Sequence, residues 1–380
     1  MALKVLIAPD KFKGTLPAAT VAEAIARGWR RVRPGDRLEL LPMSDGGDGF
    51  GEVLGRLLGA KAQAVRTVDA AHRAIIAEWW WEPRTATAII ESATAIGLAA
   101  LPAGKFHPFD LDACGLGTVL RAADTAGVKR CLVGIGGSAT NDGGFGLARA
   151  LGWQFFNHRG GEIQRWTELA SLARLESPKV PVSVGRLVVA VDVQNPLLGP
   201  SGCTRVFGPQ KGLRAADFNS AERCLARLAA VAEKQFGGRF ADEPGAGAAG
   251  GLGFGLRCFA GAKLEPGFAV FSRHAKLARR VKSAQLVLTG EGRVDEQTLM
   301  GKGTGRLADM CRDSGVACIV IAGEIATSAK PLAGRFSRAY ALVPGLTSRK
   351  NALAEPAVWL AQAAAIAAKE LAGWLKPPPD

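Results

Sequence analysis

The chain has 380 residues and a formal net charge of +14, with 48% hydrophobic and 22% charged residues. This length exceeds what one hydrophobic core usually serves, and we therefore expect two domains. Glycine occurs 48 times, which is typical of an α/β protein with many tight turns. The composition excludes a disordered chain.

The cysteine pattern and the apolar segments favour a soluble protein of a reducing compartment. The seven cysteines are odd in number, scattered and without a Cys-x-x-Cys pair, which indicates neither a disulfide framework nor a zinc site. Residues 1–10 lack the features of a signal peptide. The alanine-rich segment 357–374 is interrupted by Gln362, Lys369 and Glu370, so it does not predict a membrane span. We expect a cytoplasmic protein with no membrane partner.

The positive charge admits two interpretations: a field that attracts anions, or an arginine-rich solvated surface. The basic residues are dispersed, in short groups such as Arg30, Arg31 and Arg33, and tyrosine occurs once. No basic run is interleaved with stacking aromatic residues. We favour the solvated surface, with mild help for small anions, and expect no nucleic-acid partner.

Short apolar runs at both ends of the chain predict five buried strands, joined by helical patterns such as 304–314. Val21, Ile25, Trp29 and Val32 follow the first strand at helical spacing. Thr15 or Thr20 is positioned to cap that helix. The predicted strands are 3–8, 37–43, 285–290, 317–323 and 339–345.

These strands predict an α/β fold with a flavodoxin-like, doubly wound parallel sheet built from both chain ends. Residues 1–65 and 280–380 would form this domain. Residues 66–279 would form a second, mixed α/β domain inserted in the middle, with the active site in the cleft between the two.

The middle of the chain mixes strand and helix patterns. Residues 72–92 predict an antiparallel pair with Pro83 in the connection, and the three tryptophans at 79–81 favour packing on both strand faces over an aromatic substrate platform. Residues 131–137 and 186–192 are typical of buried strands followed by functional loops. Residues 220–234 predict a helix.

Six loops carry most of the polar residues, and most of them follow a predicted strand. Because the carboxyl ends of parallel strands lie at one edge of a sheet, side chains from these loops should converge there. The loops are 10–14 (DKFKG), 44–49 (SDGGDG), 134–144 (GIGGSATNDGG), 192–199 (DVQNPLLG), 245–255 (GAGAAGGLGFG) and 290–303 (GEGRVDEQTLMGKG).

Two glycine-rich loops are candidates for phosphate binding, since glycine permits a row of N–H groups to approach phosphate oxygens. Tight turns are the alternative for either loop alone, but two such loops together favour phosphate. Asp142 is a possible Mg²⁺ contact, and no Walker A motif is present, because Gly303 follows Lys302. The candidate nucleotide-binding residues are Gly136, Gly137, Ser138, Thr140, Asn141, Gly143, Gly247, Gly250 and Gly251.

Three acids are candidates for catalysis and for metal binding. Asp192 ends an apolar run, which favours a catalytic base or metal ligand. Asp45 and Asp48 lie among glycines, where aspartate often only builds a turn. Asp295 lies two residues after Arg293, where function and surface ion pairing are equally plausible. We take Asp192, Asp295 and Asp45 as both the catalytic and the metal-binding candidates.

The substrate-binding candidates are polar residues of the same loops and of the segment FGPQKG at 207–212. All four histidines lie outside these loops, which argues against histidine catalysis, and no G-x-S-x-G motif is present. The candidates are Asp10, Lys11, Lys13, Asn195, Lys211 and Arg293, with Lys302 a further possible contact.

Taken together and in order, these segments resemble the bacterial glycerate kinase family of the type that forms 2-phosphoglycerate. The resemblance spans nearly the whole chain. It rests on IAPDKFKGTL (7–16), LPMSDGGDG (41–49), VGIGGSATNDGGFG (133–146), DVQNPLLG (192–199), VFGPQKG (206–212), GAGAAGGLGFG (245–255) and TGEGRVDEQTLMGKG (289–303).

The resemblance implies ATP, Mg²⁺ and D-glycerate as ligands, and transfer of the γ-phosphoryl group to a glycerate hydroxyl. The chain departs from the family pattern at Cys114, at Leu116, at Thr304 and in HPFDLD at 107–112. A kinase for another small hydroxy acid and a non-catalytic sugar-acid sensor are the alternatives. The pattern gives no oligomeric state.

Overall fold

The computed structural model describes residues 2–299, 303–326 and 335–374. The chain divides into two compact units. One combines residues 1–44 with 271–380, and the other comprises residues 45–270. We call them the split unit and the inserted unit.

The split unit contains a five-stranded parallel sheet in the order β13-β12-β11-β1-β2. The two N-terminal strands pair with three strands from the C-terminal third of the chain, as predicted. This order is that of a flavodoxin-like sheet, which confirms the predicted fold class. The strands are β1 (Lys4–Ile7), β2 (Arg37–Leu40), β11 (Leu286–Val294), β12 (Ala317–Ile325) and β13 (Arg338–Val343).

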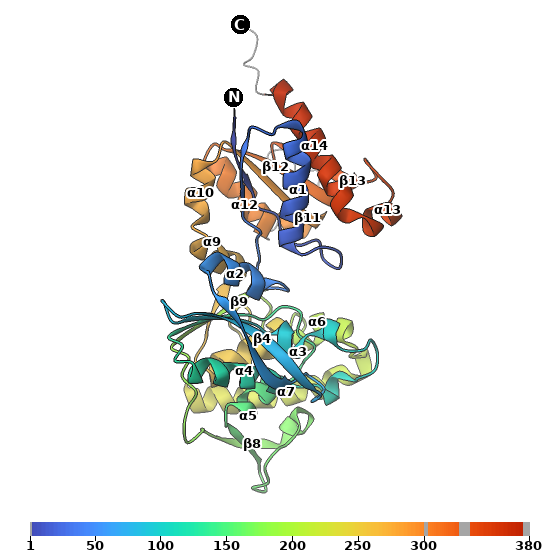
Figure 1. Ribbon diagram of the computed structural model, residues 1–380. Helices are drawn as coiled ribbons and strands as arrows, with labels where there is room; N and C mark the ends of the chain where they lie inside the picture. The colour runs from blue at the N-terminus through green and yellow to red at the C-terminus, as the bar shows by residue number, and fades with distance from the viewer. Residues whose placement is uncertain (1, 300–302, 327–334, 375–380) are drawn as a thin grey trace. The chain divides into compact units, whose positions relative to one another are not determined.

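Helices cover both faces of this sheet (Figure 1). On one face, α1 and α14 pack together so closely that a Cβ at Gly28 would lie 1.9 Å from the Ala361 carbonyl oxygen. On the other face, α10 packs on β1 and α12 packs on β11 and β12. The helices are α1 (Ala18–Val32), α10 (Leu277–Ser283), α11 (Glu296–Leu299), α12 (Gly303–Asp313), α13 (Arg349–Ala354) and α14 (Pro356–Trp374).

The inserted unit contains a mixed six-stranded sheet in the order β10-β9-β6-β5-β4-β3. The four strands from β10 to β5 are parallel, and β3, β4 and β5 are joined antiparallel. The strands are β3 (Lys61–Val68), β4 (Ala74–Glu82), β5 (Thr87–Glu91), β6 (Arg130–Gly134), β9 (Arg186–Val191) and β10 (Lys263–Pro266); β7 (Gln154–Asn157) and β8 (Leu172–Glu176) form a separate pair.

The tryptophans of β4 pack on opposite faces of this sheet, as predicted. The Trp80 ring lies against Gly51 and Gly55 of α2, whereas Trp79 joins the core that contains Leu116 of α4 and Leu252 of α8. The helices are α2 (Phe50–Leu58), α3 (Ala93–Ile96), α4 (Cys114–Thr125), α5 (Phe145–Ala150), α6 (Cys203–Lys211), α7 (Ala215–Phe236) and α8 (Ala248–Phe259), with short 3₁₀ segments η1 (Leu98–Ala100), η2 (Pro108–Asp110) and η3 (Trp166–Ser171). Helix α9 (Gly267–His274) crosses the boundary between the units.

Three details differ from the sequence-based expectations. Strand β11 continues to Val294, through residues predicted as a loop, because it pairs with β12 as far as Ile325. Helix α1 is preceded by Pro17 without a side-chain cap, so the predicted caps at Thr15 and Thr20 are wrong. Residues 45–65 belong to the inserted unit here, and the division at 65/66 and 279/280 stays a prediction.

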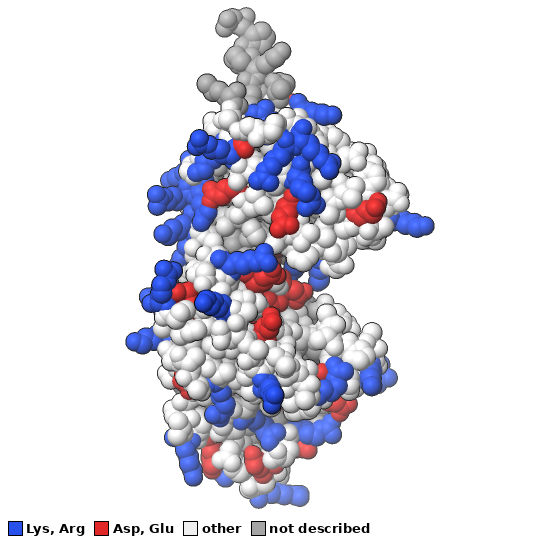
Figure 2. Space-filling view, viewed as in Figure 1, with Lys and Arg blue, Asp and Glu red and all other residues white. Residues whose placement is uncertain are grey.

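Lysine and arginine side chains are spread over the face of the molecule shown in Figure 2 rather than gathered in one stripe. Within the described ranges, no helix has the length and apolarity needed to cross a membrane.

Candidate functional site

The loop Asp45–Gly49 follows the carboxyl edge of the four parallel strands of the inserted unit. It passes β10, where a Cβ at Gly267 would lie 1.6 Å from the Asp45 carbonyl oxygen, and then β9, where a Cβ at Gly46 would lie 2.7 Å from the Ala190 carbonyl oxygen. After β6, Gly136 N–H donates to the Gly46 carbonyl at 3.1 Å. A Cβ at Gly46 or Gly267 would collide with a backbone carbonyl oxygen, so the path requires glycine at both positions.

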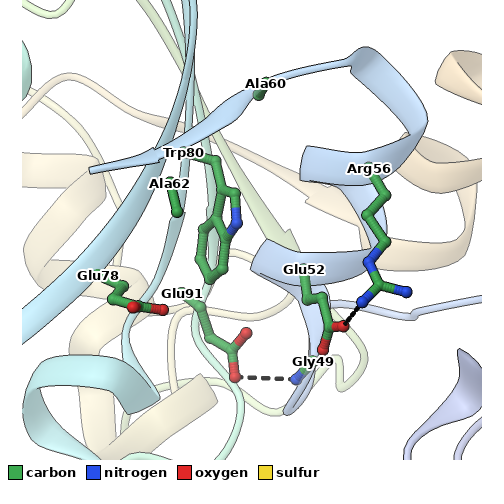
Figure 3. Close-up of a pocket in the computed structure, with 8 residues that line it drawn as sticks. All are labelled: Gly49, Glu52, Arg56, Ala60, Ala62, Glu78, Trp80 and Glu91. Atoms are coloured by element: carbon green, nitrogen blue, oxygen red, sulfur yellow. Dashed lines mark hydrogen bonds and ion pairs between the residues drawn. The ribbon is translucent and has the colours of Figure 1, made fainter. Parts of the chain in front are cut away.

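Glu91, the last residue of β5, anchors the end of this loop (Figure 3). Its Oε1 accepts from Gly49 N–H at 2.9 Å and its Oε2 from Gly51 N–H at 3.0 Å. These N–H groups belong to the start of α2, where a carboxylate is favoured by the helix dipole. Glu91 therefore fixes the polar loop to the sheet, a role that the sequence analysis did not find.

The pocket in Figure 3 lies beside this anchor and has a volume of about 490 Å³. Its wall contains the Trp80 ring and three carboxylates, while its one cationic side chain, Arg56, is paired with Glu52 at 2.7 Å. A pocket with this excess of carboxylates suits an anionic ligand poorly. The lining residues are Gly49, Glu52, Arg56, Ala60, Ala62, Glu78, Trp80 and Glu91.

The loop after β6 is held from inside by Asp142. This carboxylate is buried, and it accepts N–H bonds from Gly144 at 3.2 Å and from Ala113 and Gly146 at 2.9 Å. Burial first, and the charge of Asp112 second, raise the pKa of Asp142 to about 6 against the opposing effect of the N–H bonds. Because the carboxylate is enclosed and occupied by the backbone, the structure favours a loop-holding role over the suggested Mg²⁺ contact.

The non-helical first turn of α8 is locked into the loop after β6. Ala249, Gly250 and Gly251 have consecutive left-handed conformations, with φ values of 56°, 72° and 86°. A Cβ at Gly250 would lie 1.9 Å from the Thr140 carbonyl oxygen, and Gly143 N–H donates to the Gly250 carbonyl at 3.1 Å. The two glycine-rich loops predicted to bind phosphate therefore lie in direct contact.

Several N–H groups of these loops are already engaged within the protein. Besides Gly136 and Gly143, Gly247 N–H donates to the Asn195 carbonyl at 2.9 Å and Gly251 N–H to the Gly247 carbonyl at 3.3 Å. These four groups hold the loops together. A phosphate contact by them stays a prediction, and it would require them to share or exchange these partners.

The polar side chains of the loop after β6 face a buried network. The Ser138 and Thr140 hydroxyls lie 3.1 Å apart, and Asn141 Nδ2 donates to Thr204 Oγ1 of α6 at 3.1 Å. Asn141 Oδ1 is buried and has no hydrogen-bond partner among the residues that the structure describes.

Lys211, at the end of α6, supports the same loop. Its Nζ is buried and donates to the Thr140 carbonyl at 2.6 Å. Burial lowers the pKa of Lys211 to about 8, and the nearby Cys203 and Asp142 oppose the decrease. The structure thus assigns Lys211 to holding the loop, and its predicted substrate contact stays a prediction.

Asp192 and Asn195 lie in the loop after β9. Asp192 directly follows the strand and is exposed, two residues beyond the Ala190 carbonyl that Gly46 approaches. Asn195 Nδ2 donates to the Ser201 carbonyl at 2.8 Å. The backbone carbonyl of Asn195 accepts a hydrogen bond from Gly247 N–H. Asp45 and Asp192 therefore project from backbone segments that pack against each other.

The split unit holds the remaining candidates at the ends of β1 and β11. Asp10 N–H donates to the Gly290 carbonyl at 2.8 Å, and a Cβ at Gly292 would lie 3.5 Å from the backbone nitrogen of Lys13. These two strands are neighbours at the point where the strand order reverses, which is where open α/β sheets bind ligands. Arg293 is exposed and lies within β11, and Asp295 follows the strand.

The structure gathers the predicted site residues into one set per unit. The set of the inserted unit contains Asp45, Asp192, Asn195, Lys211 and both glycine-rich loops, and the set of the split unit contains Asp10, Lys11, Lys13, Arg293 and Asp295. Lys302 lies outside the described residues. The sequence analysis missed Glu91 and gave Asp48 only the role of a turn residue. The Oδ1 of Asp48 would lie 2.1 Å from a Cβ at Gly137, so this carboxylate packs against the loop after β6.

The match to known proteins covers almost the whole chain. A model of the glycerate kinase family matches residues 5–372. The chain belongs to this family. A glycerate kinase of Halalkalibacterium halodurans is 37% identical over 364 residues, which are 95% of this chain and 96% of the relative.

Two further relatives agree with this membership in the glycerate kinase family. A glycerate 2-kinase of Escherichia coli K12 is 36% identical over 329 residues, which are 85% of this chain and 86% of the relative. A crystal structure of the Salmonella typhimurium LT2 protein assigned as glycerate kinase 2 matches with a TM-score of 0.84 and 32% identity, covering 98% of this chain and 99% of the other.

Proposed function

We propose that this protein is a kinase that transfers the γ-phosphoryl group of ATP to the 2-hydroxyl of D-glycerate, giving 2-phosphoglycerate and ADP. The observation that carries the proposal is the contact among four loops at one sheet edge of the inserted unit, Asp45–Gly49, 134–144, 192–199 and 245–255. Phosphoryl transfer depends on such fixed positioning of polar groups more than on covalent chemistry by the protein.

Asp192 is the proposed general base. A glycerate hydroxyl is barely ionised near neutral pH, and a carboxylate that takes its proton during attack contributes ~10²–10⁴-fold to the rate. Asp192 is exposed at the end of β9, so a small substrate can reach it, whereas Asp142 in the neighbouring loop is enclosed.

The residues also fit a bound Mg²⁺, because the ion prefers carboxylate oxygens and several carboxylates lie in these loops. Asp45, Asp192 and Asp295 are the candidates to hold it, and Asp45 and Asp192 come from backbone segments in mutual contact. When bound, Mg²⁺ would neutralise negative charge on the phosphate oxygens.

The anionic groups of the substrates need cationic or amide partners. Lys11 and Lys13 in the loop after β1, with Arg293 of β11, form the cationic group of the split unit, and we assign to them the glycerate carboxylate and phosphate oxygens. The loops at 134–144 and 245–255 would supply N–H and hydroxyl donors to ATP. We propose that both sets serve the same reaction.

The test is ATP consumption by the purified protein with a panel of small hydroxy acids. We expect turnover with D-glycerate well above that with L-glycerate, lactate or tartronate. If another acid of the panel supports faster ATP consumption than D-glycerate, that acid is the substrate and the proposed substrate is wrong. Glycerate binding without ATP consumption under any condition would favour a non-catalytic sensor.

A further inference from the structure

A cluster of three side chains with different donor atoms lies in the inserted unit. His72 belongs to the turn between β3 and β4, Asp112 precedes α4, and Cys114 is the first residue of α4. His72 Nε2 lies 2.9 Å from Asp112 Oδ2, and the nitrogen, oxygen and sulfur donor atoms all lie within 4.8 Å of one another.

We propose that His72, Asp112 and Cys114 form a binding site for one divalent transition metal ion of the zinc class. Imidazole nitrogen, carboxylate oxygen and thiolate sulfur are the ligands of tetrahedral Zn²⁺ sites, in which three protein ligands leave one position for water. The sulfur and imidazole donors select Zn²⁺ or Co²⁺ over Mg²⁺, which prefers oxygen ligands. This inference is separate from the proposed kinase reaction.

The spacing of the donors agrees with such an ion. Metal–ligand bonds of ~2.0–2.3 Å at tetrahedral angles separate the donor atoms by about 3.4–3.6 Å. The 2.9 Å distance between His72 Nε2 and Asp112 Oδ2 must increase by about half an ångström. The Cys114 sulfur, which lies within 4.8 Å of the other two donor atoms, must move closer to them. Side-chain rotations provide both movements, since the His72 side chain is 51% exposed.

The backbone around the ligands is fixed before any ion arrives. Asp69 Oδ1 accepts N–H bonds from Ala71 and Arg73 at 2.9 Å and so closes the turn that carries His72. Asp112 N–H donates to the Ala70 carbonyl at 3.1 Å, which joins the turn to the segment before α4. The ligand-bearing segments are therefore held together by bonds that the ion need not supply.

Two further properties of the cluster suit a cation. Burial, and then the carboxylates of Asp112 and Asp142, raise the pKa of the Cys114 thiol against the opposing effect of the Arg149 guanidinium, so these two carboxylates favour a cation at the sulfur. His72 adopts a left-handed conformation, with a φ of 58°, which costs a non-glycine residue free energy. Glycine would relieve that strain, and a ligand role gives a physical reason for histidine at this position.

This site could not be predicted from the sequence, because its ligands lie at 72, 112 and 114 and form no Cys-x-x-Cys or histidine pair. The fold brings residues forty positions apart to one point.

The experiment is a Co²⁺ titration of the metal-stripped full-length protein, followed by absorbance and equilibrium dialysis. We expect one ion to bind per chain with a thiolate-to-Co²⁺ charge-transfer band, and Zn²⁺ to displace it. The band identifies the sulfur ligand, so Co²⁺ bound by carboxylates elsewhere does not produce it.

Three variants separate ligand loss from misfolding. Cys114→Ser should abolish the band, and His72→Gly should weaken Co²⁺ binding by ~100-fold or more, since even the loss of an outer partner costs 10–100-fold. Cys258→Ser is the matched control, because Cys258 is another half-buried free thiol outside the cluster. His72→Gly fits the local backbone, so it should remain folded, as circular dichroism would show.

Absence of saturable Co²⁺ binding to the wild-type protein would overturn the proposal. A charge-transfer band that persists in Cys114→Ser, or that disappears in Cys258→Ser, would overturn it as well. If His72→Gly folds and binds Co²⁺ as tightly as the wild type, the ligand set proposed here is wrong.

Discussion

Asp192 is the residue on which the proposed chemistry depends most. Its exposure after β9 means that its replacement should leave the core undisturbed. In Asp192→Asn the side chain keeps its shape and loses its charge and basicity. We expect kcat to fall by ~10²-fold or more, while the free energy of unfolding changes by no more than ~0.5 kcal/mol.

Steady-state kinetics and thermal melting check this prediction, with Asp242→Asn as the matched control. Asp242 is also exposed and pairs with the exposed Arg239 at 2.8 Å. Titration with Mg²⁺ then distinguishes the two possible roles, because only a lost metal ligand should be partly rescued by more Mg²⁺. Wild-type turnover in Asp192→Asn would remove this residue from the mechanism and make Asp295, then Asp45, the next candidate.

Asp142 should leave a signature in the pH dependence of stability. Its pKa is raised from 3.8 to about 6 in the folded protein, so the folded state binds more protons than the unfolded state between these values. The contribution of Asp142 to stability is therefore fully present below pH 3.8 and is lost as the pH rises through 6. The shift corresponds to about 3 kcal/mol.

Urea unfolding of the wild type and of Asp142→Asn between pH 4 and 7 measures this contribution. The difference between the two free energies of unfolding should change across that range in favour of Asp142→Asn as the pH rises. Parallel curves for the two proteins would contradict the buried position of this carboxylate.

At the scale of the elements, the contact between the two glycine-rich loops can be tested with a pair of glycines. Gly250 and Gly261 both have left-handed φ values, 72° and 66°, but a Cβ at Gly250 would lie 1.9 Å from the Thr140 carbonyl oxygen, whereas nothing lies within 4 Å at Gly261. Alanine at either position has the same backbone cost, about 1 kcal/mol. Gly250→Ala should cost several kcal/mol more and reduce turnover.

Chemical denaturation and the KM for ATP check this prediction. Gly261→Ala provides the baseline for the backbone cost, and the excess loss in Gly250→Ala reports the collision with Thr140. Equal stability of the two variants would show that the loops are not locked as described.

The elements that could be predicted from the sequence are those with a strong local pattern. The strands 3–8, 131–137 and 186–192 are apolar runs because they are buried on both faces, and helix α7 shows a regular apolar stripe. The extension of β11 to Val294 could not be predicted, because its last residues are small or charged and depend on pairing with β12.

The polar loops could be located from the sequence, but their internal roles could not. Asp142 and Lys211 have the residue types of ligand contacts, and the structure turns both toward the backbone of one loop. Glu91 binds N–H groups about forty residues earlier in the chain. Such partners are set by tertiary contacts, which no local spacing records.

At the scale of the whole molecule, the two units differ in how the chain supplies them. The inserted unit is one continuous segment, 45–270, whereas the sheet of the split unit needs β1 and β2 from one end and β11 to β13 from the other. We expect the fragment 45–270 to melt cooperatively on its own. A fragment of residues 1–150 should not, because β1 would lack β11 and leave an unpaired edge.

Calorimetry of the two fragments checks this expectation. A sharp two-state melt of residues 1–150 would contradict the split arrangement. The fragment 45–270 should also fail to consume ATP with D-glycerate, because it lacks Asp10, Lys11, Lys13, Arg293 and Asp295.

The central claim is that the whole chain phosphorylates the 2-hydroxyl of D-glycerate. The most direct measurement couples the reaction with ATP and D-glycerate to enolase, which consumes 2-phosphoglycerate, in the absence of a phosphoglycerate mutase. We predict that phosphoenolpyruvate forms at once and at the rate of ATP consumption. A signal that appears only after mutase is added would mean that the 3-hydroxyl is phosphorylated and would contradict the proposal.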